Sequence, residues 1–347
     1  MTPKTRILVV GGGGVGAIVA LNLQSGCQTE LTLVLRSNYT AVQQHGFQVH
    51  SCDHGKLLNW RPWKSELYTD VCHNNTNTNT VVNTIPNISC DEDEDAFDFV
   101  VVTAKNIPNA HANLASQISP SVTPGITTIV LIQNGLNIEQ PYFNIFPRNI
   151  VLSGISMIGS EEIEPGFIKH SFADHLTIGS FHNPNLETAK EFKEAERFVG
   201  IYSAGGKTVC MHDKNVLWNR WKKLVYNSSI NPICALTGLD AGQIRMAGDS
   251  ISLLVRDAMR EIEAAANASG YELPVDIVEF MATVDPVEDH FAPSMLQDGN
   301  SIEYEYLLGE PLREGKRLGV AMPVLSTLYA LCSAIQWRIE AERESIE

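Results

Sequence analysis

Short apolar runs alternate with helical patterns over the first half of the chain. The apolar runs lie at 6–10, 31–35, 97–103 and 126–132. The helical stretches lie at 14–25, 107–118 and 136–145. The runs are nearly continuous, as in strands that are covered on both faces, and strand–helix–strand repetition is typical of a doubly wound parallel sheet. We therefore predict an α/β fold here, with further strands between 150 and 180 added in antiparallel orientation.

The second half is dominated by helical patterns, and Gly205-Gly206 is a suitable hinge before them. The patterns cover 185–203, 213–230, 249–268, 273–283 and 321–343. We predict two domains: an α/β domain over residues 1–206 and a mostly α-helical domain over residues 207–347.

One stretch of the first domain breaks the alternation. Residues 52–96 contain the low-complexity segment 74–80 (NNTNTNT) and the acidic run 91–95 (DEDED), neither of which can bury a core. We interpret 52–96 as a polar insertion in which both segments are solvated loops, with a partner-binding loop as the alternative.

Composition excludes several classes of function. The chain of 347 residues has a net charge of −15, with 44% hydrophobic and 19% charged residues. An acidic chain repels phosphate backbones and anionic lipid surfaces, so we expect neither a nucleic-acid nor a membrane partner. No apolar stretch is long enough to predict a membrane span.

The cysteines favour a protein that stays inside the cell. There are seven, they are scattered, and no Cys-x-x-Cys pair occurs. This argues against a disulfide framework and a zinc knuckle, and we expect no metal site. The uncharged stretch 7–23 superficially resembles a signal peptide, but its consecutive glycines suit a turn better. We expect a cytoplasmic protein, with an organelle as the open alternative.

A glycine-rich motif follows the first predicted strand. Gly11, Gly13 and Gly16 form G-x-G-x-x-G between that strand and a helix. In dinucleotide-binding domains the first glycine allows a tight turn, the second lets a pyrophosphate approach the backbone, and the third lets the helix pack closely. The helix N-terminus adds unpaired N–H groups and a favourable dipole. The motif predicts a Rossmann-type domain, and a merely flexible glycine run is the alternative.

The ends of later strands carry candidate ligand-binding residues. NAD-binding domains usually place an acid about 20 positions beyond the glycines, but Arg36 stands there, which favours the 2′-phosphate of NADP(H) over a surface arginine. Lys105 and Asn134 also follow strands, at the edge where an open α/β sheet binds ligands. Taken singly, the lysine could be solvated and the asparagine part of a turn.

A polar row stands out in the helical domain. Its members, spaced four apart among Trp and Leu residues, are Asn219, Lys223, Asn227 and Asn231. A helix would align them on one face, and asparagine is a poor residue for a helix interior, so helix propensity does not explain the row. A lysine desolvated there has a lowered pKa and can donate a proton near neutral pH. A solvated helix face is the alternative.

A last cluster comprises Ser294, within PSMLQD, and Glu303, within IEYEYLLGE. A helix cap and an exposed carboxylate are the simpler interpretations of these two residues. Together with GGGGVG, VVTAKN, LIQNG, WKKLVYNSSINP and VAMPVLSTLY, these segments resemble ketopantoate reductases (2-dehydropantoate 2-reductases) in the family's order and over nearly the whole chain. The chain looks like a fungal-type member.

The resemblance implies a Rossmann-type NADP-binding domain and NADPH-dependent reduction of a 2-oxo acid. It implies that Lys223 is the catalytic proton donor and that Glu303 orients the substrate. It also implies substrate contacts by Asn227, Asn231 and Ser294. The cofactor contacts that it implies are Gly11, Gly13, Gly14, Val15, Gly16, Arg36, Lys105 and Asn134.

The expected reaction is the reduction of 2-dehydropantoate to pantoate, a step of pantothenate biosynthesis, with a small-molecule 2-oxo acid as the partner. A reductase of the same family that acts on another carbonyl, and a non-catalytic NADP(H)-sensing protein, are the alternatives. A pure sensor need not keep the lysine and asparagine row. The apolar helices of the second domain fit either a homodimer interface or a core.

Overall fold

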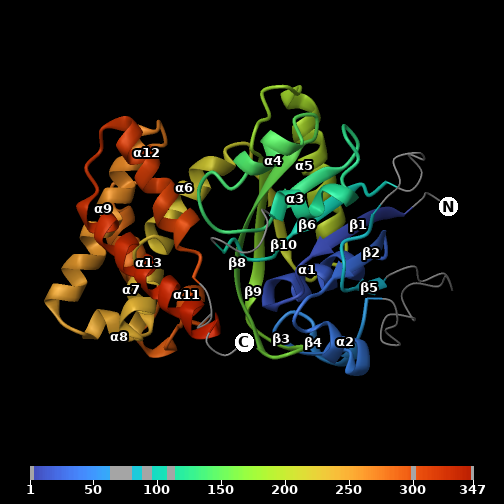
Figure 1. Cartoon of the computed structure of the whole chain (residues 1–347), viewed down its shortest axis with the longest axis horizontal. Coiled ribbons are helices and arrows are strands. Elements are labelled where there is room, and N and C mark those ends of the chain that lie inside the picture. The colour runs from blue at the N-terminus through green and yellow to red at the C-terminus, as the bar shows by residue number, and fades with distance from the viewer. Residues whose placement is uncertain (1–3, 63–79, 88–95, 108–113, 298–301, 345–347) are drawn as a thin grey trace. The chain divides into compact units, whose positions relative to one another are not determined.

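The computed structural model describes residues 4–62, 80–87, 96–107, 114–297 and 302–344 (Figure 1). The chain forms two compact units. The first comprises Met1–Ala104, Ala112–Gln133 and Glu139–Val216, and the second comprises Lys105–His111, Asn134–Ile138 and Leu217–Glu347. The predicted boundary between residues 206 and 207 lies shortly before Leu217, and the two loop segments that join the second unit were not part of that prediction.

The first unit is built on one sheet, which has ten strands in the described part of the chain. The strands are β1 (Thr5–Val10), β2 (Thr29–Val34), β3 (Phe47–Ser51), β4 (Gly55–Trp60), β5 (Thr80–Val82), β6 (Phe99–Val102), β7 (Thr128–Leu131), β8 (Val151–Glu164), β9 (Phe167–Ser180) and β10 (Val209–His212). Their order is β4-β3-β9-β8-β7-β6-β1-β2-β5, and β10 pairs with β9. The strands from β8 through β7, β6, β1 and β2 to β5 run parallel, and β9 is antiparallel to β8. The predicted α/β fold and its antiparallel addition are confirmed.

Helices explain why the central strands are apolar throughout. The first unit contains α1 (Gly14–Ser25), α2 (Tyr39–His45), α3 (Leu114–Ile118) with the 3₁₀ turn Ser119–Ser121, α4 (Gln140–Ile145) and α5 (Thr188–Ser203). Helices α1 and α5 pack together on the sheet, and α3 packs against α4. Every residue of β6 and β7 is buried. This is the pattern of parallel strands that are covered on both faces.

Part of the predicted polar insertion is sheet. Strand β4 forms an antiparallel hairpin with β3 and buries Leu57 and Trp60, and β5 pairs with β2 and buries Val81. The prediction of a polar insertion over 52–96 does not hold for these strands, because a half-exposed strand needs an apolar residue only at alternate positions. Residues 63–79 and 88–95, which include most of both predicted loops, lie outside the described residues.

The cysteine prediction also needs a correction. Cys27 is disulfide-bonded. Cys52, Cys210, Cys234 and Cys332 carry free thiols. The scattered spacing of the cysteines concealed the bond, because residues that are distant in the sequence can meet in the fold.

The second unit is mostly α-helical, as predicted. In its described part the helices are α6 (Val216–Asn227), α7 (Ile230–Thr237), α8 (Ala241–Met246), α9 (Asp249–Ala268), α10 (Ile277–Thr283), the 3₁₀ turn Val287–Asp289, α11 (Ser294–Gln297), the π-helical segment η5 (Glu305–Gly309), α12 (Glu310–Leu318) and α13 (Pro323–Glu344). Helix α9 packs against α10, α12 and α13, and α7 packs against α11 and α13. Among the helices described, none has both the length and the apolar character needed to cross a membrane.

Candidate active site

The glycine loop between β1 and α1 requires glycine at its first and last motif positions. Gly11 has φ +105°, and a methyl group on it would lie 2.7 Å from the backbone nitrogen of Ala104. A methyl group on Gly16 would lie 2.0 Å from the carbonyl oxygen of Gly11. A side chain at either position would therefore push the helix and the loop apart.

The middle of the same loop is open. The nearest atom to a methyl group placed on Gly13 is the Glu162 Oε2, at 3.9 Å. Gly13 is the N-cap of α1, makes no side-chain cap, and is followed by no acidic residue in the first turn. The helix N-terminus thus presents backbone N–H groups to a space that glycine leaves free, which fits the pyrophosphate of a dinucleotide.

The other predicted residues of this loop support its shape. The Gly14 carbonyl oxygen accepts a hydrogen bond of 2.8 Å from Ser160 Oγ on β8, and a methyl group on Gly14 would meet the backbone of Ser160. Val15 is half-buried and packs against the core of the first unit. Gly14 and Val15 therefore position the loop through the Gly14 backbone and the packing of the Val15 side chain.

Arg36 lies at the end of β2, beside the glycine loop. Its side chain is exposed, and the next loop is held to the glycine loop by Asn38, whose Nδ2 donates to the Gly12 carbonyl oxygen at 2.9 Å. The same Nδ2 donates to Glu162 Oε1 at 2.7 Å. Neither Asn38 nor Glu162 was predicted from the sequence. Glu162 comes from β8, far along the chain, so no local signal connects it to the glycines.

Lys223 projects from α6 in the second unit. It is half-buried, and its Nζ donates a 3.0 Å hydrogen bond to Asn134 Oδ1. Burial and the positive charge of Arg220 together lower the pKa of Lys223 to about 8, against the carboxylate of Glu303, which raises it. The two charged neighbours thus compete, and burial decides the direction of the shift.

Glu303 precedes η5 and is buried, with 4% of its surface exposed. Its Oε1 accepts a hydrogen bond of 2.9 Å from the backbone N–H of Asn106. A buried carboxylate is stabilised by hydrogen-bond donors and by nearby positive charge, and Glu303 has both. The segment that carries Asn106 begins at Lys105, which is exposed.

Arg220 and Tyr306, which were not predicted from the sequence, fix the backbone next to Asn134. The buried Arg220 donates from Nη1 to the Gly135 carbonyl oxygen at 2.8 Å. Gly135 has φ +106°, and a methyl group on it would lie 2.5 Å from Cβ of Tyr306 in η5. Arg220 lies one helical turn before Lys223, and that spacing was the only signal for it.

The predicted asparagine row is divided by a helix break. Helix α6 ends at Asn227, and α7 begins at Ile230. Between them Ser229 Oγ donates to the Val225 carbonyl oxygen at 2.5 Å, and Ser228 Oγ donates to the Leu307 carbonyl oxygen at 2.6 Å. Serines that bond back to the preceding turn bend helices. Helix α6 thus accounts for most of the stretch predicted as helical over 213–230, but the expectation that Asn231 continues the same helix face is wrong.

The break leaves the asparagines on different helices. Asn227 is buried at the end of α6, and Asn219 is half-buried two turns earlier. On α7, Asn231 Nδ2 approaches Ser294 Oγ at 3.4 Å. The buried Asn231 Oδ1 has no hydrogen-bond partner among the described residues. A buried acceptor of this kind is unusual in a native protein and suits a donor from a ligand.

The predicted residues thus form two groups. The glycine loop and Arg36 belong to the first unit. The second unit brings together Lys223, Asn134 and Glu303, and it pairs Asn231 with Ser294. A Rossmann-type unit with a complete glycine motif, followed by a helical unit with a half-buried lysine, is the architecture of two-domain dinucleotide-dependent oxidoreductases.

The chain belongs to the ketopantoate reductase family. It matches the family described as "Ketopantoate reductase PanE/ApbA" over residues 7–183 and the family described as "Ketopantoate reductase PanE/ApbA C terminal" over residues 215–336. The resemblance inferred from the motifs is confirmed, and so is the expectation of an oxidoreductase family.

Three proteins are similar to this chain in sequence or in fold. An uncharacterized protein of Saccharomyces cerevisiae is 35% identical, over 98% of this chain and 96% of its own. The crystal structure of 2-dehydropantoate 2-reductase from Methylococcus capsulatus is 28% identical, covers 96% of this chain and 97% of its own, and has a TM-score of 0.75. A ternary structure of D-mandelate dehydrogenase with NADH and anilino(oxo)acetate is 19% identical, with a TM-score of 0.76 and coverage of 97% and 99%. This last likeness concerns the fold alone.

Proposed function

We propose that the protein reduces a 2-oxo acid with NADPH, with 2-dehydropantoate as the preferred substrate and Lys223 as the general acid. One observation carries the proposal. In a member of the ketopantoate reductase family, Lys223 is half-buried, hydrogen-bonded to Asn134 and close to the charge of Glu303. A solvated lysine on a helix surface would have none of these surroundings.

The cofactor is proposed from the glycine loop and Arg36. The open space at Gly13 and the unpaired N–H groups of α1 fit a pyrophosphate, and the exposed guanidinium of Arg36 suits a 2′-phosphate. When bound, NADPH supplies the hydride. The D-mandelate dehydrogenase structure contains NADH, so the cofactor preference of this chain has to be measured.

Lys223 supplies the proton. As an ammonium group it hydrogen-bonds the carbonyl oxygen of the substrate and donates a proton as negative charge develops there. A pKa of about 8 leaves the lysine mostly protonated at neutral pH while making its proton easier to give up. Asn134 holds the Nζ in position, and Glu303 favours the charged form before the reaction.

The substrate is held by Asn231 on α7 and Ser294 on α11. Asn231 Oδ1 is a buried acceptor that a substrate hydroxyl can satisfy, and Ser294 Oγ lies beside the same side chain. 2-Dehydropantoate carries such a hydroxyl, whereas a simple branched 2-oxo acid lacks it. A site with a buried polar atom discriminates strongly against an analogue that leaves this atom unpaired.

The test is the oxidation of NADPH and of NADH in the presence of 2-dehydropantoate and 2-oxo acids that lack its hydroxyl. We expect the highest kcat/KM with NADPH and 2-dehydropantoate, and loss of turnover in Lys223→Ala with NADPH binding retained. If another 2-oxo acid is reduced and 2-dehydropantoate is not, the proposed substrate is wrong and the proposed role of Lys223 stands. Binding of NADPH without turnover of any 2-oxo acid would identify a sensor, and failure to bind either dinucleotide would refute the proposal.

A further inference from the structure

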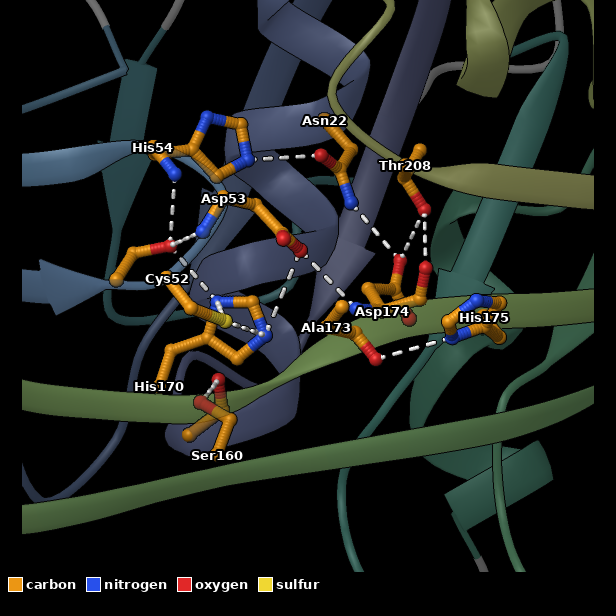
Figure 2. Close-up of polar contacts among 12 residues, drawn as sticks. Asn22, Cys52, Asp53, His54, Ser160, His170, Ala173, Asp174, His175 and Thr208 are labelled. Carbon is orange, nitrogen blue, oxygen red and sulfur yellow. Dashed lines mark hydrogen bonds and ion pairs between the residues drawn. The ribbon is translucent and has the colours of Figure 1, made fainter.

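A second cluster of chemically active side chains lies in the first unit. Cys52 and Asp53 come from the turn between β3 and β4, and His170 comes from β9 (Figure 2). One ligand atom from each, a sulfur, a carboxylate oxygen and an imidazole nitrogen, lie within 4.8 Å of one another. The proposed reduction uses none of these residues.

The imidazole ring of His170 is buried and fixed in orientation. Its side chain has no exposed surface, and its Nδ1 forms a 2.8 Å hydrogen bond with Ser51 Oγ. Its Nε2 lies 3.7 Å from Asp53 Oδ2, and Cys52 Sγ lies beside the ring, 3.8 Å from Nε2 and 3.9 Å from Nδ1. The distance to the carboxylate oxygen is too long for a hydrogen bond. A fully buried imidazole therefore lies close to two further groups that can bind a metal ion.

The three ligand atoms are nearly as close together as the ligand atoms of a metal site. With zinc–sulfur and zinc–nitrogen bonds of ordinary length, the ligand atoms of a tetrahedral site lie about 3.5 Å apart. The distances from His170 Nε2, 3.7 and 3.8 Å, exceed this by only a few tenths of an ångström. Cys52 Sγ is as near to Nδ1 as to Nε2, so the exposed Cys52 side chain has to rotate toward the Nε2 side of the ring for all three atoms to reach bonding distance.

Neighbouring groups already orient the three side chains. Ser51 Oγ occupies the Nδ1 side of the His170 ring, which leaves Nε2 free to bind a metal. Asp53 Oδ2 accepts a 3.0 Å hydrogen bond from the Asp174 backbone N–H, and the Cys52 backbone N–H donates to the His170 carbonyl oxygen at 3.0 Å. Metal-binding histidines and carboxylates commonly have such outer partners.

We propose that Cys52, Asp53 and His170 form a site for a single Zn²⁺ ion, with water as the fourth ligand. A thiolate together with an imidazole and a carboxylate favours zinc over magnesium or calcium, which prefer oxygen ligands. Cys52 is exposed, so the ion and the water can enter from solvent.

The ion would connect the β3–β4 turn to β9. His170 is also the register partner of Ser160, whose hydroxyl holds the Gly14 carbonyl of the glycine loop. Figure 2 shows Ser160 on the strand next to His170. The proposed ion therefore has a structural role: it stabilises the pairing of β8 with β9, which supports the glycine loop. The proposal is independent of the proposed reductase activity.

The test uses the full-length, tag-free protein after removal of metal by a chelator. Titration with Co²⁺ should give visible bands of a tetrahedral ion and a thiolate-to-cobalt charge-transfer band. Zn²⁺ should displace the cobalt at one ion per chain and raise the thermal unfolding temperature. We expect Cys52→Ser to remove the charge-transfer band and to weaken Zn²⁺ binding at least roughly tenfold.

Matched variants distinguish this site from other thiols and histidines. Cys210→Ser removes a free thiol from β10, and His175→Gln removes an exposed histidine from β9 itself. Both should bind Zn²⁺ like the parent protein. Cys52 is exposed, so Cys52→Ser is expected to fold, and the conclusion does not depend on a variant of the buried His170. Absence of stoichiometric metal binding, or binding that persists unchanged in Cys52→Ser, would overturn the proposal.

Discussion

The glycine loop of the first unit presents backbone atoms, whereas the lysine site of the second unit is made of side chains. Within the loop, the important features are a positive φ at Gly11, an open space at Gly13 and a close approach at Gly16. The lysine site needs Asn134, Lys223 and Glu303 from three distant segments. A contiguous backbone site tolerates few substitutions anywhere, while an assembled site depends on a few particular functional groups.

The largest expected effect is at Lys223. Replacing it with alanine removes the proposed proton donor, and loss of general acid catalysis should lower kcat by roughly 10²–10⁴-fold. The dissociation constant of NADPH should change little, because the proposed phosphate contacts are made by the glycine loop and Arg36. Steady-state kinetics and fluorescence titration of NADPH measure the two quantities.

Lys222→Ala is the matched control for that experiment. Its Nζ lies 5.5 Å from the ring centre of Trp218, so it has a different environment on the same helix. We expect nearly parental kcat in this variant. Equal losses in both variants would mean that helix α6 had been damaged and that the specific role of Lys223 was wrong.

The next largest effect concerns the choice of cofactor. Arg36→Ala should reduce the ratio of kcat/KM for NADPH to that for NADH by roughly 10- to 100-fold, the value of a charge-assisted hydrogen bond to the 2′-phosphate. Arg148→Ala removes another exposed arginine of the first unit and should leave the ratio unchanged. A preference for NADH in the parent protein would contradict the assignment directly.

A smaller effect is expected at Gly13. A methyl group there meets no atom of the protein closer than 3.9 Å, so Gly13→Ala should fold with a free energy of unfolding within about 0.5 kcal/mol of the parent. The methyl group would occupy the space proposed for the pyrophosphate and should weaken NADPH binding about tenfold, or about 1.4 kcal/mol.

Gly200→Ala provides the comparison for Gly13. Gly200 lies in helix α5, and a methyl group on it would meet nothing within 4 Å. This variant should gain up to about 1 kcal/mol of stability from the higher helix propensity of alanine, without any change in NADPH binding. Unchanged binding in Gly13→Ala as well would place the dinucleotide elsewhere.

The smallest expected effect is a shift in pH dependence. Reduction requires protonated Lys223, so kcat/KM of the parent should be constant below its pKa of about 8 and fall above it. Glu303→Gln removes the charge that raises this pKa, so the fall should begin at a lower pH. An unchanged pH profile would show that Glu303 does not act through the lysine.

Strong periodicity made the larger elements predictable. The helix expected over 249–268 is α9, Asp249–Ala268, and the first strand, helix and second strand are present near the expected bounds. Strands β3, β4 and β10 are short and partly exposed, so their apolar residues are too few to produce a clear pattern. The break before α7 depends on serine hydroxyls that bond to carbonyl groups, and such bonds leave no hydrophobic signal.

The candidate site was predictable where side-chain chemistry is unusual. A lysine among tryptophans and asparagines stood out. Asn106 did not, because it acts through its backbone N–H, and Arg220 did not, because it binds a carbonyl group. Backbone donors and acceptors are present at every residue, so only the fold can reveal which of them is used.

The second unit includes the loops Lys105–His111 and Asn134–Ile138, which follow strands β6 and β7 of the first. A chimera made by joining the N-terminal part of one family member to residues 217–347 of this chain would bring Lys223 without its native Asn134, and Glu303 without its native Asn106. Recombination at that junction would therefore disrupt the site unless both loops came from the same parent. Mutations in these loops and in the helical unit are thus expected to be selected together, although they lie far apart in the gene.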